Sequence, residues 1–302
     1  MTITLFAGCG GNKNDNSTQT ESSTSSSVSS NANDESSEAD QKDDSQESSS
    51  EESSEKSEAE KTDEDDGAPL TGSCGDNATY KVDADGTLTI EGTGVVNKAF
   101  LVMNELSDTE IKNVVISEGI TELGEQVFSG GVKIESITLP STLEKIGYQT
   151  FYSCVDLKKI EFPENFTGLD QRCFASCTGL EEVRLSGKIK TISEGAFQGC
   201  NNLKEIVIPE GVTTIDEAAF YMCPKLSSLT LPSTLEKIGT DVFSRDTKIM
   251  NITIPESVSK IEKSAFSFWS KDQTITVKGK SADTVEWDEL WNDNCNAKIN
   301  WE

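Results

Sequence analysis

Four evenly spaced cysteines are the residues of this sequence with the most obvious chemical potential. Cys154, Cys177, Cys200 and Cys223 follow one another at intervals of 23 residues. Thiolates bind zinc and take part in redox reactions, but a zinc site usually draws its ligands from two close pairs, whereas these thiols would stack in a single row. We therefore interpret the row as buried thiols that pack as small apolar residues. A disulfide between neighbouring members of the row stays open as an alternative.

Other catalytic and metal-binding chemistry has little support in the sequence. The 302 residues include no histidine, which removes the commonest general base and metal ligand. Glu161 and Glu182 form an acidic pair of the kind that glycoside hydrolases use, but a sheet face offers them neither an enclosing pocket nor burial. The stretch "DADG", Asp83–Gly86, lacks the closing glutamate of a calcium loop, because Gly92 stands in its place, and we expect a hairpin turn. We expect no enzyme, no cofactor and no metal.

The first nine residues, "MTITLFAGC", suggest processing at a cysteine. "FAGC" resembles the lipobox of bacterial lipoproteins, in which the cysteine becomes the diacylated N-terminus, and the resemblance implies lipidation of Cys9. Phe6 replaces the usual aliphatic residue, and the usual basic and long apolar segments are missing, so residues 1–9 are interpreted as a truncated-looking lipoprotein signal. Two acyl chains would hold the protein stably on a membrane. The alternative is that Cys9 is an ordinary residue near a chain end.

Residues 10–66 have the composition of a disordered tether. They include 18 acidic residues, 4 basic residues and 17 serines, with no Leu, Ile, Phe, Tyr or Trp. Such a segment cannot bury enough apolar surface to offset the entropy of ordering it. The net charge of −27 also argues against nucleic acid and against electrostatic docking to anionic lipid, so contact with a membrane is expected only through the lipid anchor.

A 23-residue repeat dominates the rest of the chain. Its markers are seven equally spaced phenylalanines, with aliphatic residues five before, nine after and eleven after each: Phe128, Phe151, Phe174, Phe197, Phe220, Phe243 and Phe266. The residues nine and eleven after each phenylalanine are apolar and alternate with polar ones, which predicts a short strand that a proline often ends. Segments such as "EAAF" predict a short helical turn. This regularity predicts a β-rich solenoid with one chain turn per repeat.

The pattern "LKEIVIPEGVTTIDEAAFYMC" strongly resembles the BspA-type leucine-rich repeats of bacterial surface proteins. The resemblance covers residues 111–277, and it implies a right-handed superhelix with a concave parallel sheet, short helical turns on the convex side, and extracellular display with adhesion or binding. Thr71–Gly94 resembles a module that often precedes such repeats in secreted clostridial proteins. We divide this part into an N-terminal β-hairpin cap at 67–110, the solenoid at 111–278 and a C-terminal cap at 279–302. The cap is rich in tryptophan, and we expect the four tryptophans to close the end of the solenoid core.

A partner is expected on the outward face of the sheet, at the positions eight and ten residues after each phenylalanine. The candidates are Ser136, Thr138, Lys159, Glu161, Glu182, Arg184, Glu205, Val207, Ser228, Thr230, Asn251 and Thr253. Mixed charges occupy the middle of this face and threonines its C-terminal third, and a solvated face without a ligand would look similar. The main hypothesis is therefore a monomeric, lipid-anchored, non-catalytic cell-surface protein that binds a protein or a host or bacterial surface component. The alternative is a spacer of the cell envelope without a specific ligand.

Overall fold

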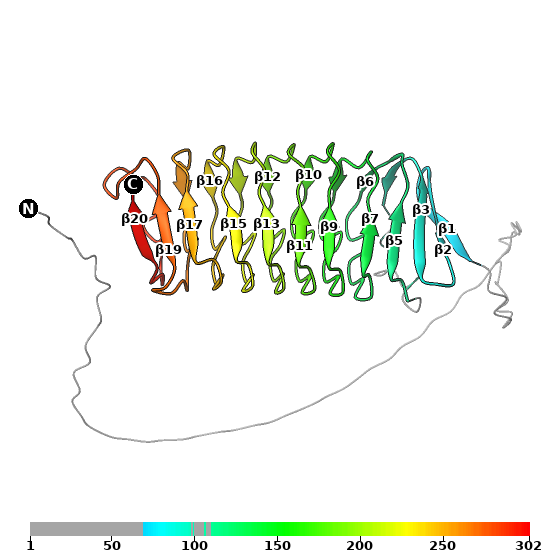
Figure 1. Cartoon of the computed structure of the whole chain (residues 1–302). Helices are drawn as coiled ribbons and strands as arrows, with labels where there is room; N and C mark the ends of the chain where they lie inside the picture. The colour runs from blue at the N-terminus through cyan, green and yellow to red at the C-terminus, as the bar shows by residue number, and fades with distance from the viewer. Residues whose placement is uncertain (1–68, 98, 100–105, 107–109) are drawn as a thin grey trace, which may run out of the picture. The chain divides into compact units, whose positions relative to one another are not determined.

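Short strands recur once per repeat and form a wide parallel sheet along one side of the molecule. The computed structural model describes residues 69–97, 99, 106 and 110–302, and this part is a row of stacked chain turns (Figure 1). The expected signal and tether, residues 1–9 and 10–66, lie outside the described residues. The expected leucine-rich repeat solenoid is confirmed.

The wide sheet contains the strands predicted from the alternating segments. They are β5 (Asn113–Ile116), β7 (Ser136–Thr138), β9 (Lys159–Glu161), β11 (Glu182–Arg184), β13 (Glu205–Val207), β15 (Ser228–Thr230), β17 (Asn251–Ile254) and β19 (Thr274–Val277). The strands form three hydrogen-bonded groups, β5–β7, β9–β15 and β17–β19, with no ladder across the two joins between them in the described residues. Within each group a residue pairs with the residue one repeat away, as Val183 does with Ile206. Because the register equals the repeat length, every second side chain of each strand points inward and the others form continuous outward rows.

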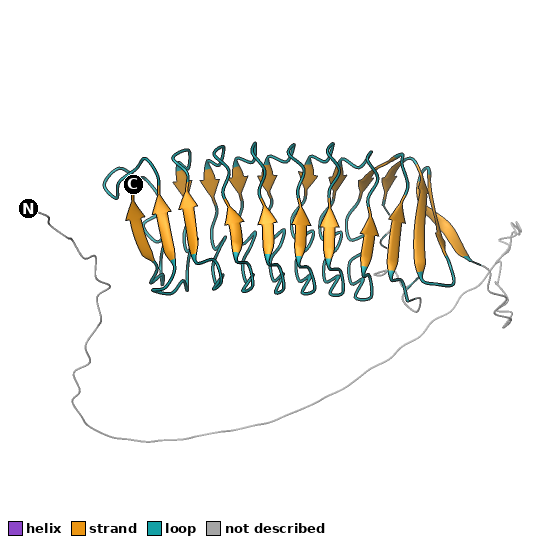
Figure 2. Ribbon diagram, in the orientation of Figure 1, coloured by secondary structure: helices purple, strands orange, loops and turns teal. Residues whose placement is uncertain are grey.

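A second, narrower row of parallel strands runs along the opposite side of the core, where the sequence pattern predicted no strand (Figure 2). We call this row the narrow sheet. Its strands are β4 (Gly94–Val96), β6 (Ile120–Leu123), β8 (Lys145–Ile146) and β10 (Gly168–Leu169) in one four-stranded sheet, and β12 (Thr191–Ile192), β14 (Thr214–Ile215), β16 (Lys237–Ile238) and β18 (Lys260–Ile261) in a second. Most are two residues long, which is too short to produce a recognisable alternation. The aliphatic residue five before each phenylalanine is the inward residue of this sheet; Ile192 and Ile215 are fully buried examples.

The segments that carry the phenylalanines are β-turns, and the expected helical turns are absent from the described residues. In residues 147–154, three overlapping turns each close with a hydrogen bond from an N–H to the carbonyl three residues earlier. Gln149 (φ 52°) and Ser153 (φ 59°) adopt the left-handed conformation, which prevents residues 147–154 from continuing as a right-handed helix. The N–H groups between these bonds point along the stack instead, as in the 2.8 Å bond from Phe151 N–H to the Cys173 carbonyl. Hydrogen bonding to the next repeat thus replaces hydrogen bonding along a helix.

The phenylalanines form the spine of the core. All seven are fully buried, and neighbouring rings stack with centroids 5.1 to 5.9 Å apart. This spacing suits offset stacking of aromatic rings and matches the distance between adjacent strands of a sheet. The stacked rings in the core and the paired strands around it therefore favour a similar rise per repeat.

Each end of the stack has a distinct closure. At the N-terminal end, β1 (Leu70–Gly75), β2 (Ala78–Val82) and β3 (Thr87–Gly92) form an antiparallel meander, and β3 pairs in parallel with β5. The "DADG" segment is the expected β2–β3 hairpin turn, with Gly86 at φ 80°. At the C-terminal end, β20 (Lys298–Trp301) pairs with β19, and Trp291 packs edge-on against Phe266. Of the four tryptophans predicted to close the core, Trp269, Trp287 and Trp291 are buried and Trp301 is half-buried against them.

Candidate binding face

The twelve residues predicted to face a partner lie on one continuous surface, the outward side of β7, β9, β11, β13, β15 and β17. Eleven of them are exposed and Glu182 is half-buried. We call this surface the wide-sheet face. Within the described part of the chain, no other element covers it (Figure 1).

Charge is concentrated at the middle of the wide-sheet face. Arg184 Nε donates a hydrogen bond to Glu182 Oε1 at 2.8 Å, and Lys159 Nζ lies 3.3 Å from the same oxygen. These donors, Arg184 first, hold the pKa of Glu182 below its ordinary value, so the carboxylate is ionised near neutral pH. A general acid of a glycoside hydrolase needs the opposite shift, so the local electrostatics give no support to a catalytic Glu161–Glu182 pair.

Two shallow hollows lie on this face. One, of about 390 Å³, is lined by Glu182, Arg184, Glu205 and Val207 together with Leu185 and Pro209. The other, of about 440 Å³, is lined by residues of β7 and β9, including four of the predicted positions, Ser136, Thr138, Lys159 and Glu161. Val207 is 63% exposed at the first hollow, which makes it an apolar contact point surrounded by charge. The candidates Ser228, Thr230, Asn251 and Thr253 line neither hollow.

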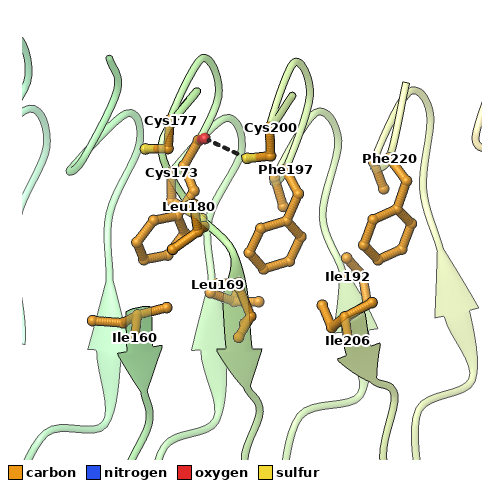
Figure 3. Close-up of a cluster of buried hydrophobic side chains, with 14 of the residues drawn as sticks. Ile160, Leu169, Cys173, Cys177, Leu180, Ile192, Phe197, Cys200, Ile206 and Phe220 are labelled. Carbon is orange, nitrogen blue, oxygen red and sulfur yellow. Dashed lines mark hydrogen bonds between the residues drawn. The ribbon is translucent and has the colours of Figure 1, made fainter. Parts of the chain in front are cut away.

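The cysteine row is a structural ladder. Each thiol is fully buried and donates to the carbonyl of the phenylalanine 26 residues earlier; Cys177 Sγ, for example, lies 3.0 Å from the Phe151 oxygen. Figure 3 shows this bond for Cys200, beside the aligned rings of Phe197 and Phe220. No disulfide links the seven cysteines of the described part, and no group of metal ligands occurs there.

Burial makes these thiols poor nucleophiles. It raises the pKa of Cys173, Cys200 and Cys223 well above the ordinary value, and a hydrogen bond with Cys177 does the same for Cys154. The interpretation of the row as buried, small apolar residues is confirmed. Its hydrogen bonds along the stack are an addition that spacing alone did not reveal.

Asp246, to which the sequence pattern assigned no role, and Trp269, which it assigned only to closing the core, also occupy the register of the ladder. Trp269 replaces the thiol with its indole N–H, which donates to the Phe243 carbonyl at 2.8 Å. Asp246 accepts a hydrogen bond from Cys223 N–H through Oδ1 at 2.8 Å, while its Oδ2 is buried without a partner. Burial raises the pKa of Asp246 well above its ordinary value. The sequence could have indicated this buried carboxyl, because Asp246 stands where four other repeats have a cysteine.

Comparison with known families agrees with this architecture. The BspA type leucine rich repeat region matches the chain in six copies, over residues 102–223 and 169–286. The chain belongs to this family. No curated protein matches it. In the described residues, no helix has the length and apolarity needed to cross a bilayer.

Similar solved structures include other leucine-rich repeat proteins, and the first of them shares the fold. A leucine-rich repeat protein from Bacteroides ovatus is 24% identical, covering 75% of this chain and 70% of that one, with a TM-score of 0.54. The T. pallidum leucine rich repeat protein is 25% identical, covering 55% of this chain and 85% of that one, with a TM-score of 0.45. A leucine rich cell surface protein from Faecalibacterium prausnitzii is 19% identical, with coverages of 73% and 73% and a TM-score of 0.42.

Proposed function

We propose that this leucine-rich repeat protein is a lipid-anchored, non-catalytic surface protein that binds a protein ligand, or a component of a host or bacterial surface, through its wide-sheet face. The observation that carries the proposal is the uncovered row of strands with two hollows at its charged centre. Repeat solenoids commonly use such extended surfaces to bind other proteins.

The centre of the face favours a partner with complementary charge around a small apolar group. Glu182 is already neutralised by Lys159 and Arg184, whereas Glu205 beside Val207 has no ion pair among the described residues. A partner that places an aliphatic or aromatic side chain on Val207 and a cation near Glu205 would satisfy both. Such a contact combines an apolar anchor with a charged rim, as in typical protein interfaces.

Binding is tested with the purified full chain against immobilised matrix proteins and bacterial surface preparations. The decisive variants are Val207→Glu and the triple reversal Lys159→Glu, Glu182→Lys and Arg184→Glu, all at exposed or half-buried positions. The matched control exchanges an ion pair of the narrow sheet, Lys260→Glu with Glu262→Lys, whose atoms lie 2.7 Å apart. A hit lost in the first two variants but kept in the control supports the proposal. No hit at all, or one that survives both variants, supports the spacer function.

Anchoring is tested separately at Cys9, which lies outside the described residues. Cells that express the native gene or its Cys9→Ala variant are fractionated after growth with an alkyne-labelled fatty acid. We expect label and membrane association for the native protein and loss of both for Cys9→Ala. An unlabelled native protein in the soluble fraction would refute the anchor.

A further inference from the structure

A groove on the turn side of the solenoid is chemically unlike the wide-sheet face. It has a volume of about 380 Å³ and crosses four consecutive repeats, from Gln149 and Tyr152 at one end to Met222 at the other. At about 4.8 Å per repeat it extends for roughly 14 Å. It goes beyond the proposed function, because no residue of the wide-sheet face lines it.

Small residues at two registers create the groove. Directly after the phenylalanine, Ala175 stands between the larger Tyr152 and Gln198 of the neighbouring repeats. One position further, Ser176 and Gly199 form the floor, and the next repeat has Met222, whose side chain is 44% exposed. The groove therefore forms where small side chains at two registers lie between larger side chains of the adjacent repeats.

The lining combines polar and apolar surface and carries no unbalanced charge. Gln149, Gln198 and Asn201 contribute amides, and Ser176, Thr178 and Tyr152 contribute hydroxyls. Arg172 is the one charged residue of the lining, and it is neutralised by Glu194 at 3.1 Å. Residues 67–302 contain 35 acidic and 22 basic residues, so an uncharged groove stands out on this surface.

Several of these polar groups have unused hydrogen-bonding capacity. Within the part of the chain that the structure describes, the side chains of Tyr152, Ser176, Thr178 and Gln198 make no hydrogen bond, although all four are half-buried. Amides and hydroxyls suit the vicinal hydroxyls of a sugar, and the Tyr152 ring and Met222 offer apolar surface to its C–H face. An ionic ligand would meet only Arg172, whose charge Glu194 already balances.

We propose that this turn-side groove binds a short, neutral oligosaccharide. The same chemistry would serve a host glycan or a glycan of a bacterial cell wall, and the experiment distinguishes the two sources. The ligand would lie along the stack and contact the amide and hydroxyl groups of four repeats.

The full-length protein is tested on immobilised oligosaccharides in three groups: neutral host-type galactosides and mannosides, neutral N-acetylhexosamine oligomers of the bacterial-wall type, and sialylated or uronic acid oligosaccharides. Uncharged peptides form a fourth group. We expect binding to one or both neutral sugar groups and at least tenfold weaker binding to the charged one. Preference for the charged sugars or for the peptides, or no binding to any group, would overturn the proposal.

Two variants locate the binding. Ala175→Gln fills the groove with a residue type that the adjacent repeat accepts at the same register, and Gln198→Ala removes an amide while leaving the floor open. Each should weaken binding at least tenfold. Tyr221→Ala is the matched control, because Tyr221 has the register of Tyr152 but does not line the groove, and it should leave affinity unchanged, as should the wide-sheet triple reversal. Equal affinity in Ala175→Gln and the wild type, with both folded by circular dichroism, would refute the site.

Discussion

Asp246 should make the stability of this solenoid depend on pH in the direction opposite to most carboxyl groups. At the same register, four thiols and one indole donate a hydrogen bond along the stack, and the corresponding acceptor for Asp246 is the Phe220 carbonyl. That oxygen accepts no hydrogen bond in the described part of the chain, because Cys223 N–H donates to Asp246 Oδ1 instead. A carboxylate cannot donate, so only protonated Asp246 can complete the ladder.

The sign and size of the effect follow from proton linkage. In the unfolded chain the aspartate ionises near pH 3.9, whereas burial raises its pKa in the folded state. The folded state therefore binds more protons above about pH 3.9, and the free energy of unfolding falls as pH rises, by about 1.4 kcal/mol per pH unit until the folded-state pKa is reached. Between pH 4.5 and 7.5 this slope limits the loss to at most about 4 kcal/mol. Cys223, the titratable group that faces Asp246, stays a neutral thiol in this range because burial raises its pKa too.

Urea unfolding of the full chain at pH 4.5 and 7.5 measures this effect. Asp246→Asn keeps an acceptor for Cys223 N–H and gains a permanent donor, and Asp246→Cys restores the thiol of the other repeats. Relative to the wild type, both variants should gain stability as the pH rises from 4.5 to 7.5, by at most about 1.4 kcal/mol for each pH unit. The matched control is Asp241→Asn, a half-exposed carboxyl of the same turn, which should show no such difference. A stability gap that is the same at both pH values would refute the argument.

Three further outcomes are expected from the core and the turns. Phe197→Ala opens a gap in the fully buried aromatic column and should lower the free energy of unfolding by about 3–5 kcal/mol in urea titration, and a loss below 1 kcal/mol would contradict the role of the spine. Met222 adopts a left-handed backbone conformation (φ 60°), so Met222→Gly should raise the free energy of unfolding by about 0.5 kcal/mol and the melting temperature slightly. A clear drop in the melting temperature would show instead that the Met222 side chain stabilises the turn. In native protein, mass spectrometry after alkylation should find half-buried Cys295 modified well before Cys177 or Cys200, and equal rates would contradict the burial of the ladder.

The sequence by itself determined the periodic part of this protein. The spacing of the phenylalanines and their aliphatic neighbours predicted the rungs, the wide-sheet strands and the inward and outward rows, because a strand alternates with a period of two and every repeat must bury the same face. Lys159, Glu182 and Arg184 were assigned to one outward surface on this basis, and the structure places both cations within 3.3 Å of Glu182 Oε1. The cysteine row stands at one register of the same repeat, whereas the burial of the tryptophans was predicted from the need to close the open end of the core.

Tertiary structure alone decided what depends on contacts between repeats. The two-residue strands of the narrow sheet are too short for a periodic signal, and they exist because Ile192 and Ile215 lie side by side in adjacent repeats. The "EAAF" segments favour helix locally, yet hydrogen bonds to the next repeat turn them into consecutive β-turns with left-handed residues. The turn-side groove likewise arises where Ala175 and Gly199 meet larger neighbours one repeat away. In each case the partner group is 22 or more residues distant in sequence, so local propensity carries no information about it.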